Sequence, residues 1–214
     1  MTQTMPGKMV AVVGLKGGCT KTTISTNLAV ELGAALVDLD ERQPHSIMWA
    51  ETRRATIEEH AGRRTKQARL TPVEAFTPDR FAGCGEPTLV VVDCPPSKGI
   101  SKIWSRLADL TVIPSRVSAA DLSSQLEAYR ACEGRVVWVL SDVRSPAEHK
   151  RAQAYLKKQG IAVVATIPSR VGVMRAFEAG MSATEYLRPS DAASVAFRGL
   201  AVKVARLLKL KARS

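Results

Sequence analysis

The stretch VAVVGLKGGCTKTTISTNL, residues 10–28, decides the fold, because a turn with two glycines and two lysines joins an apolar run to an amphipathic segment. Phosphate-binding loops usually read G-x-x-x-x-G-K-[ST] and lie between a strand and a helix. Aligned on Lys21, that pattern requires glycine at two positions where this chain has Leu15 and Thr20. A second lysine, Lys16, stands directly before the two glycines. The stretch therefore predicts a phosphate site of an unusual kind.

The size and composition of the chain fit one globular domain. Its 214 residues suffice for an ordinary domain core, so we take residues 1–214 as a single domain. The formal net charge of +11 favours an anionic partner, which could be a nucleic acid, a lipid surface or a polyphosphate. The four cysteines lack paired short spacing and predict neither a zinc site nor a disulfide framework. With no secretory signal pattern and no run of about 20 apolar residues, we expect a cytoplasmic protein.

Six apolar runs rich in valine and isoleucine alternate with segments of helical spacing. The runs are nearly continuous, as expected for strands buried on both faces of a parallel sheet. They cover residues 9–14, 34–40, 88–93, 110–114, 136–140 and 161–166. Helices are predicted at 22–32, 119–131 and 146–159, with Ser118 and Ser145 as N-caps. The alternation predicts a doubly wound α/β fold, with a mainly parallel sheet flanked by helices as in P-loop NTPases.

The segment of residues 53–79 interrupts this alternation. It is polar, rich in arginine and weakly periodic, with Pro72 and Pro78 as breaks. We expect a helix that continues from Ser46, then a surface segment with one edge strand near residues 70–76. We expect its arginines to form a solvated face.

Acidic residues close two of the predicted strands. Asp93 closes the third apolar run, and Asp38 and Asp40 close the second. Carboxyl ends of neighbouring parallel strands meet where α/β folds bind ligands, so these carboxylates should lie near the loop. Lys21 is then expected to pair with terminal phosphates, and the hydroxyl of Thr22 to bind Mg²⁺.

Several motifs resemble those of one known family. The stretch KGGCTKTT, residues 16–23, looks like the deviant Walker A motif, KGGxxK[ST], of the ParA/MinD ATPases. VDLDERQPHSIMW (37–49) is similar to the family's D-x-D-P-Q segment followed by a tryptophan, and VVVDCPPS (90–97) to its D-x-P-P segment. Residues 108–122 and 162–193 resemble later parts of the family fold. The likeness is to the short ParA proteins of plasmid partition systems and their relatives.

The resemblance implies a Mg²⁺-dependent ATPase that works as a dimer. Two ATP-bound protomers would pack face to face, with Lys16 of each reaching the phosphates of the other. Lys16, Lys21 and Asp40 would be catalytic, with Asp40 positioning the attacking water. Thr22 and Asp93, the latter through water, would hold Mg²⁺, with Asp40 next outside them. The implied nucleotide-binding residues are Lys16, Gly17, Gly18, Cys19, Thr20, Lys21, Thr22 and Thr23.

The sequence departs from the family pattern at three places. Thr20 stands where the family usually has glycine, and a β-branched residue is unfavourable there if the backbone must adopt positive φ. Residues 40–44 read DERQP where D-P-Q-G is usual. Ser141 follows its strand where the family often has an asparagine that contacts the base. The preference for adenine is therefore implied by the family alone.

The last segment, residues 197–214, is basic and contains no acid. An apolar stripe at helical spacing predicts a helix that packs on the sheet, which leaves a basic outer face. The resemblance implies nonspecific binding of DNA by such residues. The candidates are Arg170, Arg175, Arg198, Lys203, Arg206, Lys209 and Lys211. The alternative is attachment to a lipid surface, as in MinD-like proteins, which the scarcity of aromatic residues in this helix makes the weaker interpretation.

Together these features predict a DNA-segregation ATPase associated with the nucleoid. Its ATP-bound dimer would bind DNA nonspecifically and be released when a ParB-like centromere-binding protein stimulates hydrolysis. One alternative is a positioning ATPase for another cargo, such as a protein cluster, an organelle or a conjugation complex. A further alternative is a DNA scaffold that binds nucleotide without hydrolysing it.

Overall fold

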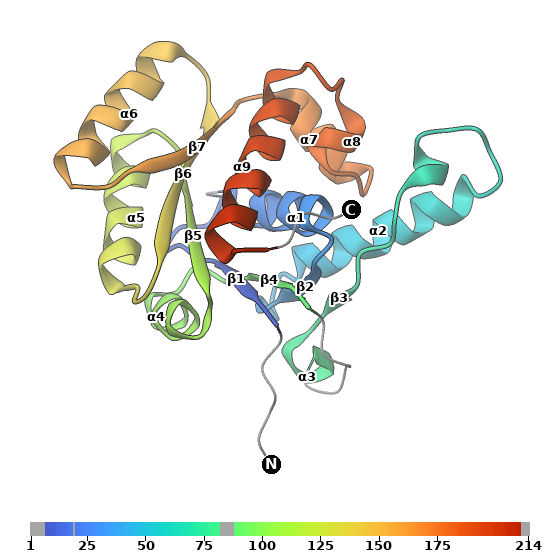
Figure 1. The fold of residues 1–214 in the computed structure, drawn as a ribbon, viewed down its shortest axis with the longest axis horizontal. Coiled ribbons are helices and arrows are strands. Elements are labelled where there is room, and N and C mark those ends of the chain that lie inside the picture. Colours follow the sequence, from blue (N-terminus) through green and yellow to red (C-terminus); the bar gives the residue numbers. More distant parts are fainter. Residues whose placement is uncertain (1–6, 19, 82–87, 211–214) are drawn as a thin grey trace.

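The computed structural model describes residues 7–18, 20–81 and 88–210, and in these its strands form one parallel sheet (Figure 1). The strand order is β3-β2-β4-β1-β5-β6-β7, and every pairing is parallel. The doubly wound α/β fold is thus confirmed, and the edge strand expected near residues 70–76 is the short β3. The strands are β1 Met9–Val12, β2 Ala35–Asp38, β3 Ala75–Phe76, β4 Val90–Asp93, β5 Leu110–Ser115, β6 Val136–Val143 and β7 Val163–Pro168.

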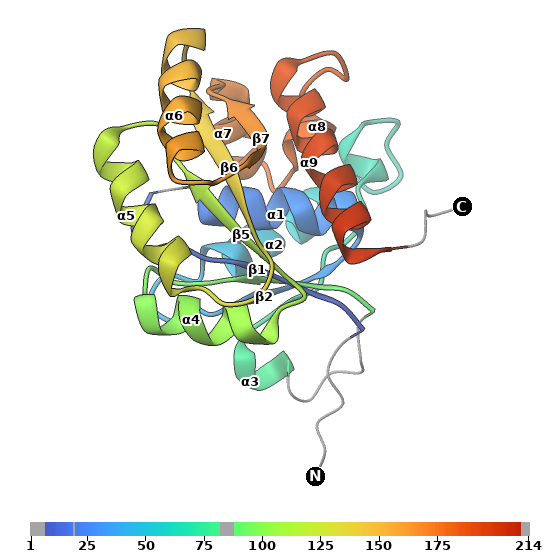
Figure 2. The same ribbon diagram turned by 60° about the vertical axis from the view of Figure 1, so that its left-hand side comes forward.

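Helices cover both faces of the sheet (Figure 2). Helices α1, α2 and α9 pack on one face together with α7 and α8, and α4, α5 and α6 pack on the other. The helices are α1 Lys21–Leu32, α2 His45–Glu59, α3 Pro78–Phe81, α4 Lys98–Leu107, α5 Ala119–Ala131, α6 Pro146–Lys158, α7 Val171–Glu178, α8 Ala183–Tyr186 and α9 Ala192–Leu208, with a 3₁₀ turn at Gln67–Arg69.

The strands divide the core into two layers. In β1, Val10 and Val12 belong to the layer on the side of α1, whereas Ala11 belongs to the layer on the side of α4. All three side chains are fully buried. Burial on both faces is what the unbroken apolar runs predicted, because neither face of a strand inside such a sheet meets water.

Serine side chains cap the start of α4, α5, α6 and α8. The side chains of Ser118 and Ser145 accept hydrogen bonds from backbone N–H groups of α5 and α6, which confirms the predicted caps. Ser97 caps α4 in the same way. No helix was assigned to residues 98–107 from the sequence, although the cap and the apolar spacing from Ile100 to Leu107 carry that signal.

Arg53 contradicts the expectation that the arginines of residues 53–79 form a solvated face. Its side chain is 0% exposed and makes a two-pronged contact with Glu185, with Nη1–Oε2 at 2.9 Å and Nη2–Oε1 at 2.7 Å. Its Nε also donates to the Thr71 carbonyl, and Nη1 donates to the Gly180 carbonyl. The guanidinium lies 5.3 Å from the ring centroid of Trp49. Arg53 therefore joins α2 to the segment before β3 and to the α7–α8 connection.

Gly180 is expected to tolerate no side chain beside Arg53. Its φ is +65°, and an added Cβ would lie 2.5 Å from the Cα of Arg53. Gly160 also has positive φ, +74°, but an added Cβ there would meet nothing within 4 Å. Gly160→Ala should therefore lose about 1 kcal/mol of unfolding free energy, from backbone strain alone. Gly180→Ala should lose about 2 to 4 kcal/mol, because overpacking adds to that strain.

Urea denaturation of the two variants and the wild type measures this difference. Equal losses at both positions would contradict the close packing of Gly180 against α2.

Candidate nucleotide site

The predicted phosphate loop, residues 15–20, lies between β1 and α1 at the carboxyl end of the sheet. Gly17 and Gly18 are exposed, and a Cβ added to either would meet no atom within 4 Å. Gly18 has φ +69°, which glycine adopts without strain. The backbone of this turn is thus open to a ligand in front of the helix N-terminus. Cys19 lies outside the described residues.

Lys21 and Thr22 open α1 and lie where the motif requires. Lys21 is 8% exposed, and its Nζ donates to the carbonyl of Lys16 at 3.1 Å. The side chain of Thr22 forms a hydrogen bond with the buried carboxylate of Asp93. Asp93 also accepts from Ser25 Oγ at 3.1 Å and from Ser46 Oγ at 2.7 Å. The structure therefore brings together the hydroxyl and the carboxylate that the sequence assigned to Mg²⁺.

A second buried carboxylate, Asp38, lies beside Asp93. The two residues are direct partners across β2 and β4. Asp38 accepts from the backbone N–H of Asp40 at 2.9 Å and from that of Ser46 at 2.8 Å. Burial raises the pKa of Asp38 to about 6, and the nearby Asp93 adds to that shift. Burial also raises the pKa of Asp93. Ser25 and Ser46 were missed from the sequence, because hydroxyl residues in helices carry no motif of their own.

Asp40, the predicted water-positioning residue, is half-buried at the start of the β2–α2 connection. Its Oδ1 accepts from the backbone N–H of Gln43 at 3.1 Å. This bond closes the local turn in the DERQP segment that departs from the family pattern. The residue directly beside Asp93 is Asp38 and not Asp40, because Asp38 is the partner of Asp93 across β2 and β4.

Asp38 should make the stability of the ligand-free protein depend on pH. Its folded pKa of about 6 exceeds the value of 3.8 expected when unfolded, so the folded state holds this proton more tightly. The protonated form of Asp38 therefore stabilises the folded protein fully below about pH 4, and this stabilisation is lost as the pH rises to about 6 and the carboxyl ionises. In Asp38→Asn this loss is absent, so the unfolding free energy of the variant relative to wild type should rise by about 2 to 3 kcal/mol from pH 4 to pH 7. Denaturant titrations across that range would contradict this if the difference stayed constant.

Lys16 points away from the loop toward α5 of its own chain. Its Nζ forms an ion pair with Asp121 Oδ1 at 2.5 Å, and Ser118 Oγ donates to Asp121 Oδ2 at 2.5 Å. Burial acts to raise the pKa of Asp121, but the hydrogen bonds from Lys16 and Ser118 outweigh it and hold that pKa below its ordinary value. One helical turn further along α5, Gln125 Oε1 accepts from the N–H of Leu15 at 3.2 Å. Helix α5 thus fixes two consecutive residues of the loop.

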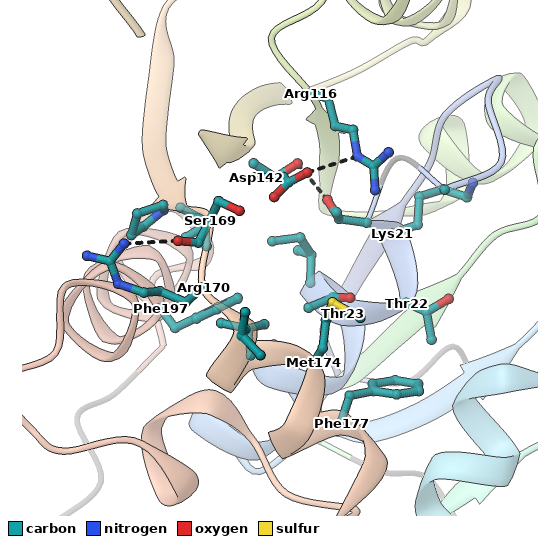
Figure 3. A pocket seen from close by; sticks show the side chains of 18 of the residues that line it. Lys21, Thr22, Thr23, Arg116, Asp142, Ser169, Arg170, Met174, Phe177 and Phe197 are labelled. Carbon is teal, nitrogen blue, oxygen red and sulfur yellow. Dashed lines mark hydrogen bonds and ion pairs between the residues drawn. The ribbon is translucent and has the colours of Figure 1, made fainter. Parts of the chain in front are cut away.

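A cavity of about 620 Å³ adjoins the loop (Figure 3). Arg116 and Asp142 lie at one end, 3.5 Å apart between Nε and Oδ2, and Arg144 approaches the same carboxylate at 3.8 Å. Met174 and Phe177 of α7 form part of the apolar wall of the cavity. A cavity of this size, with the exposed backbone of the loop at one side and apolar surface at another, can hold a nucleotide. Thr20, Lys21, Thr22 and Thr23 line it.

Thr20 adopts a left-handed backbone conformation, in which threonine is rarely found. Its φ is 69° and its ψ is 17°, where a β-branched side chain costs about 1–2 kcal/mol. The condition under which the sequence made threonine unfavourable here, a positive φ at this position, is met in the structure. The Thr20 hydroxyl contacts Ser141 Oγ on β6 at 2.6 Å.

The predicted DNA-contact residues divide into two groups. Arg170 and Arg175 belong to the α7 region, where Arg170 lines the nucleotide cavity and lies 3.9 Å from Asp191. On α9, the guanidinium of Arg198 donates to the Pro189 carbonyl, and Lys203 Nζ donates to the Val164 carbonyl on the edge strand β7. Their remaining N–H groups are the part that could meet phosphates. Arg206 and Lys209 are exposed at the end of α9, and Lys211 lies outside the described residues.

The described part of the chain contains neither a ready-made metal cluster nor a membrane-spanning helix. No cluster of three or more His, Cys, Asp or Glu side chains among them could hold a metal ion. None of the described helices is long and apolar enough to cross a membrane.

Comparisons with known proteins agree with this geometry. Residues 10–183 match the model of the CobQ/CobB/MinD/ParA nucleotide-binding domain. The chain is 31% identical over 184 residues to "maintenance of carboxysome distribution protein A" of Gloeobacter kilaueensis, covering 80% of this chain and 78% of that protein. The septum site-determining protein MinD of Pyrococcus horikoshii, solved with Mg-ADP, superposes with a TM-score of 0.71 at 16% identity, covering 97% of this chain and 99% of MinD. An ATP complex of a Cyanothece McdA variant gives 0.65 at 15% identity, covering 99% and 100%. The chain therefore belongs to the CobQ/CobB/MinD/ParA nucleotide-binding domain family and has the fold of its ParA/MinD ATPases.

Proposed function

We propose that the protein is an ATP-hydrolysing switch that positions a cargo other than plasmid DNA inside the cytoplasm. The observation that carries the ATPase part is the open phosphate loop with Lys21 and Thr22 in front of the buried carboxylate of Asp93. The cargo part is supported by the relative from Gloeobacter kilaueensis, whose name concerns carboxysome distribution. Plasmid partition with a ParB-like partner is the second candidate, because it uses the same switch and the same basic α9 face.

The residues present fit Mg²⁺-ATP. The Thr22 hydroxyl would bind the metal ion directly and Asp93 would hold its water shell, while the exposed backbone at Gly17 and Gly18 would surround the phosphates. The raised pKa of the Asp93 carboxyl marks a buried acid that gains from a nearby cation. Bound Mg²⁺ would neutralise charge that develops on the phosphates. Asp40 would orient the attacking water.

The active form would be a dimer with ATP between the protomers. Lys16 would leave Asp121 and reach the phosphates of the partner. Nonspecific DNA would be the surface on which the dimer travels, bound by the basic outer face of α9. That face also exposes Val195 and Val202, at 53% and 49%. Exposed valines beside basic residues are the one observation that favours a lipid surface instead.

Binding assays with and without ATP test these surfaces. We expect ATP, but not ADP, to promote binding to nonspecific duplex DNA, and sedimentation with anionic vesicles to be unchanged by nucleotide. Arg206→Glu should weaken DNA binding by about tenfold, because it reverses one charge on the α9 face. Arg151→Glu is the matched control on α6, where the exposed arginine lies across the sheet. Nucleotide-dependent binding to vesicles without DNA binding would reject the DNA surface and favour the lipid one.

Turnover and partner capture test the switch and its cargo. A measurable Mg²⁺-dependent release of phosphate from ATP is expected, and intact ATP binding without turnover would favour the scaffold interpretation. The Asp40→Ala variant should bind ATP without hydrolysing it, which makes it the form to use for capturing partners. Recovery of a protein that binds specific DNA sites would favour partition over positioning of another cargo.

A further inference from the structure

Two positions at which the sequence departs from the family pattern contact each other. Thr20 stands where the family usually has a glycine in the phosphate loop, and Ser141, on β6, stands where the family often has an asparagine. The two residues are 121 positions apart in the chain, yet their hydroxyl oxygens lie 2.6 Å from one another. Ser141 is 2% exposed, so its Oγ is held at a fixed place beside the loop. The departures therefore form one structural unit.

The backbone on both sides of this contact is irregular. Thr20 has φ 69°, and Asp142, the neighbour of Ser141, has φ 54°. Pairing of β6 with β7 shifts register between Leu140 and Val143, which is the irregularity that carries Ser141 and Asp142. Non-glycine residues persist in left-handed conformations only where the surroundings hold them. The hydroxyl contact is such a restraint for Thr20.

The conformation of Thr20 controls where the helix begins. Its carbonyl accepts the first hydrogen bond of α1, from the N–H of Ile24 at 2.9 Å. The direction of the N–H groups that open the helix therefore depends on the backbone at this residue. Glycine would adopt the same conformation without help, whereas threonine needs an anchor.

We propose that the Thr20–Ser141 hydroxyl pair holds the phosphate loop in its phosphate-binding conformation, and that Ser141 serves the loop and does not read the base. The proposal rests on the proposed nucleotide function of the same site. It assigns Thr20 and Ser141 as positioning residues. It also explains how the loop adopts this shape with threonine in place of glycine at position 20.

Three variants separate anchoring from base recognition. Thr20→Val keeps the β-branch and removes the hydroxyl, Ser141→Ala removes the partner hydroxyl, and Thr20→Gly removes the need for an anchor. Calorimetric affinities are measured for Mg²⁺-ATP and for inorganic tripolyphosphate, which has neither base nor sugar. Circular dichroism checks that every variant is folded.

Each of Thr20→Val and Ser141→Ala should weaken both ligands by about tenfold and by the same factor, as expected from losing one hydrogen bond that restrains the loop. The double variant Thr20→Val/Ser141→Ala should be no weaker than either single variant, because both remove the same contact. Adding Thr20→Gly to Ser141→Ala should restore both affinities to within about threefold of wild type.

Three results would overturn the proposal. Unchanged affinities in Ser141→Ala would show that the contact is irrelevant to binding. A loss for ATP with unchanged tripolyphosphate would make Ser141 a base or sugar contact. Losses that multiply in the double variant would show that the hydroxyls act separately. A wild-type protein that binds neither ligand would instead reject the proposed function itself, so the two failures can be told apart.

Discussion

Replacing Lys16 with glutamine is expected to lower ATP turnover by about 100-fold or more, while the affinity for ATP changes by less than about threefold. The structure separates the two lysines of the loop. Lys21 is buried with its Nζ on the Lys16 carbonyl, at the position from which it can serve its own site. The Lys16 side chain is 46% exposed and pairs with Asp121 on α5, outside the cavity. In the proposed dimer, Lys21 binds the phosphates of its own site already in the monomer. Lys16 reaches the phosphates of the partner only after the dimer forms, so its charge stabilises the transition state without contributing to ATP binding by the monomer.

Mixing two inactive variants tests whether Lys16 acts on the partner. Lys16→Gln retains Asp40, and Asp40→Ala retains Lys16, so a mixed dimer contains one complete site if the lysine acts in trans. Equal amounts should recover about a quarter of the wild-type rate, because half of the dimers are mixed and each has one working site. Lys8→Gln is a control, because Lys8 pairs with Asp109 at the other end of β1. No recovery on mixing, or wild-type turnover in Lys16→Gln alone, would reject the trans role.

Local signals in the sequence predicted the strand, turn and helix that surround the loop motif. Lys21, Thr22 and Asp93 are placed by a strand, a tight turn and a helix whose apolar spacing is readable within a few residues. The Ser118 and Ser145 caps were predicted for the same reason. Thr20 was identified as a departure because the family usually has glycine at this position, and a positive φ there would disfavour a β-branched residue.

Contacts between residues that are far apart in the chain could not be predicted from the sequence. Arg53 lies in a run of arginines that reads as solvated, and its partner Glu185 lies 132 residues away. Thr20 and Ser141 are 121 positions apart in the chain. The sequence therefore showed each residue as a separate departure from the family pattern, and could not show that the two side chains are in contact. The resting position of Lys16 on Asp121 likewise depends on how α5 packs beside the loop. Such contacts are set by the topology of the sheet, which periodicity does not encode.

The burial of Arg53 leads to the largest expected effect on stability. Arg53→Met should lower the free energy of unfolding by about 3–5 kcal/mol, because it removes the cation paired with Glu185 and the donor to two backbone carbonyls. Burial acts to raise the pKa of Glu185, but the bonds from Arg53 outweigh it and hold that pKa below its ordinary value. Without Arg53 the carboxylate loses this stabilisation of its charged form, so the destabilisation should lessen at acidic pH.

The neighbouring Arg54 provides the matched control for this prediction. It is on the same helix and is exposed, so Arg54→Met should change the unfolding free energy by no more than about 0.5 kcal/mol. The double variant Arg53→Met/Glu185→Gln should recover part of the loss, because it removes the uncompensated charge while the carbonyls of Thr71 and Gly180 still lack a donor. Denaturant unfolding measures all three variants. Equal stability of Arg53→Met and Arg54→Met would mean that the guanidinium does not tie α2 to the α7–α8 connection, and that apolar packing around Trp49 suffices.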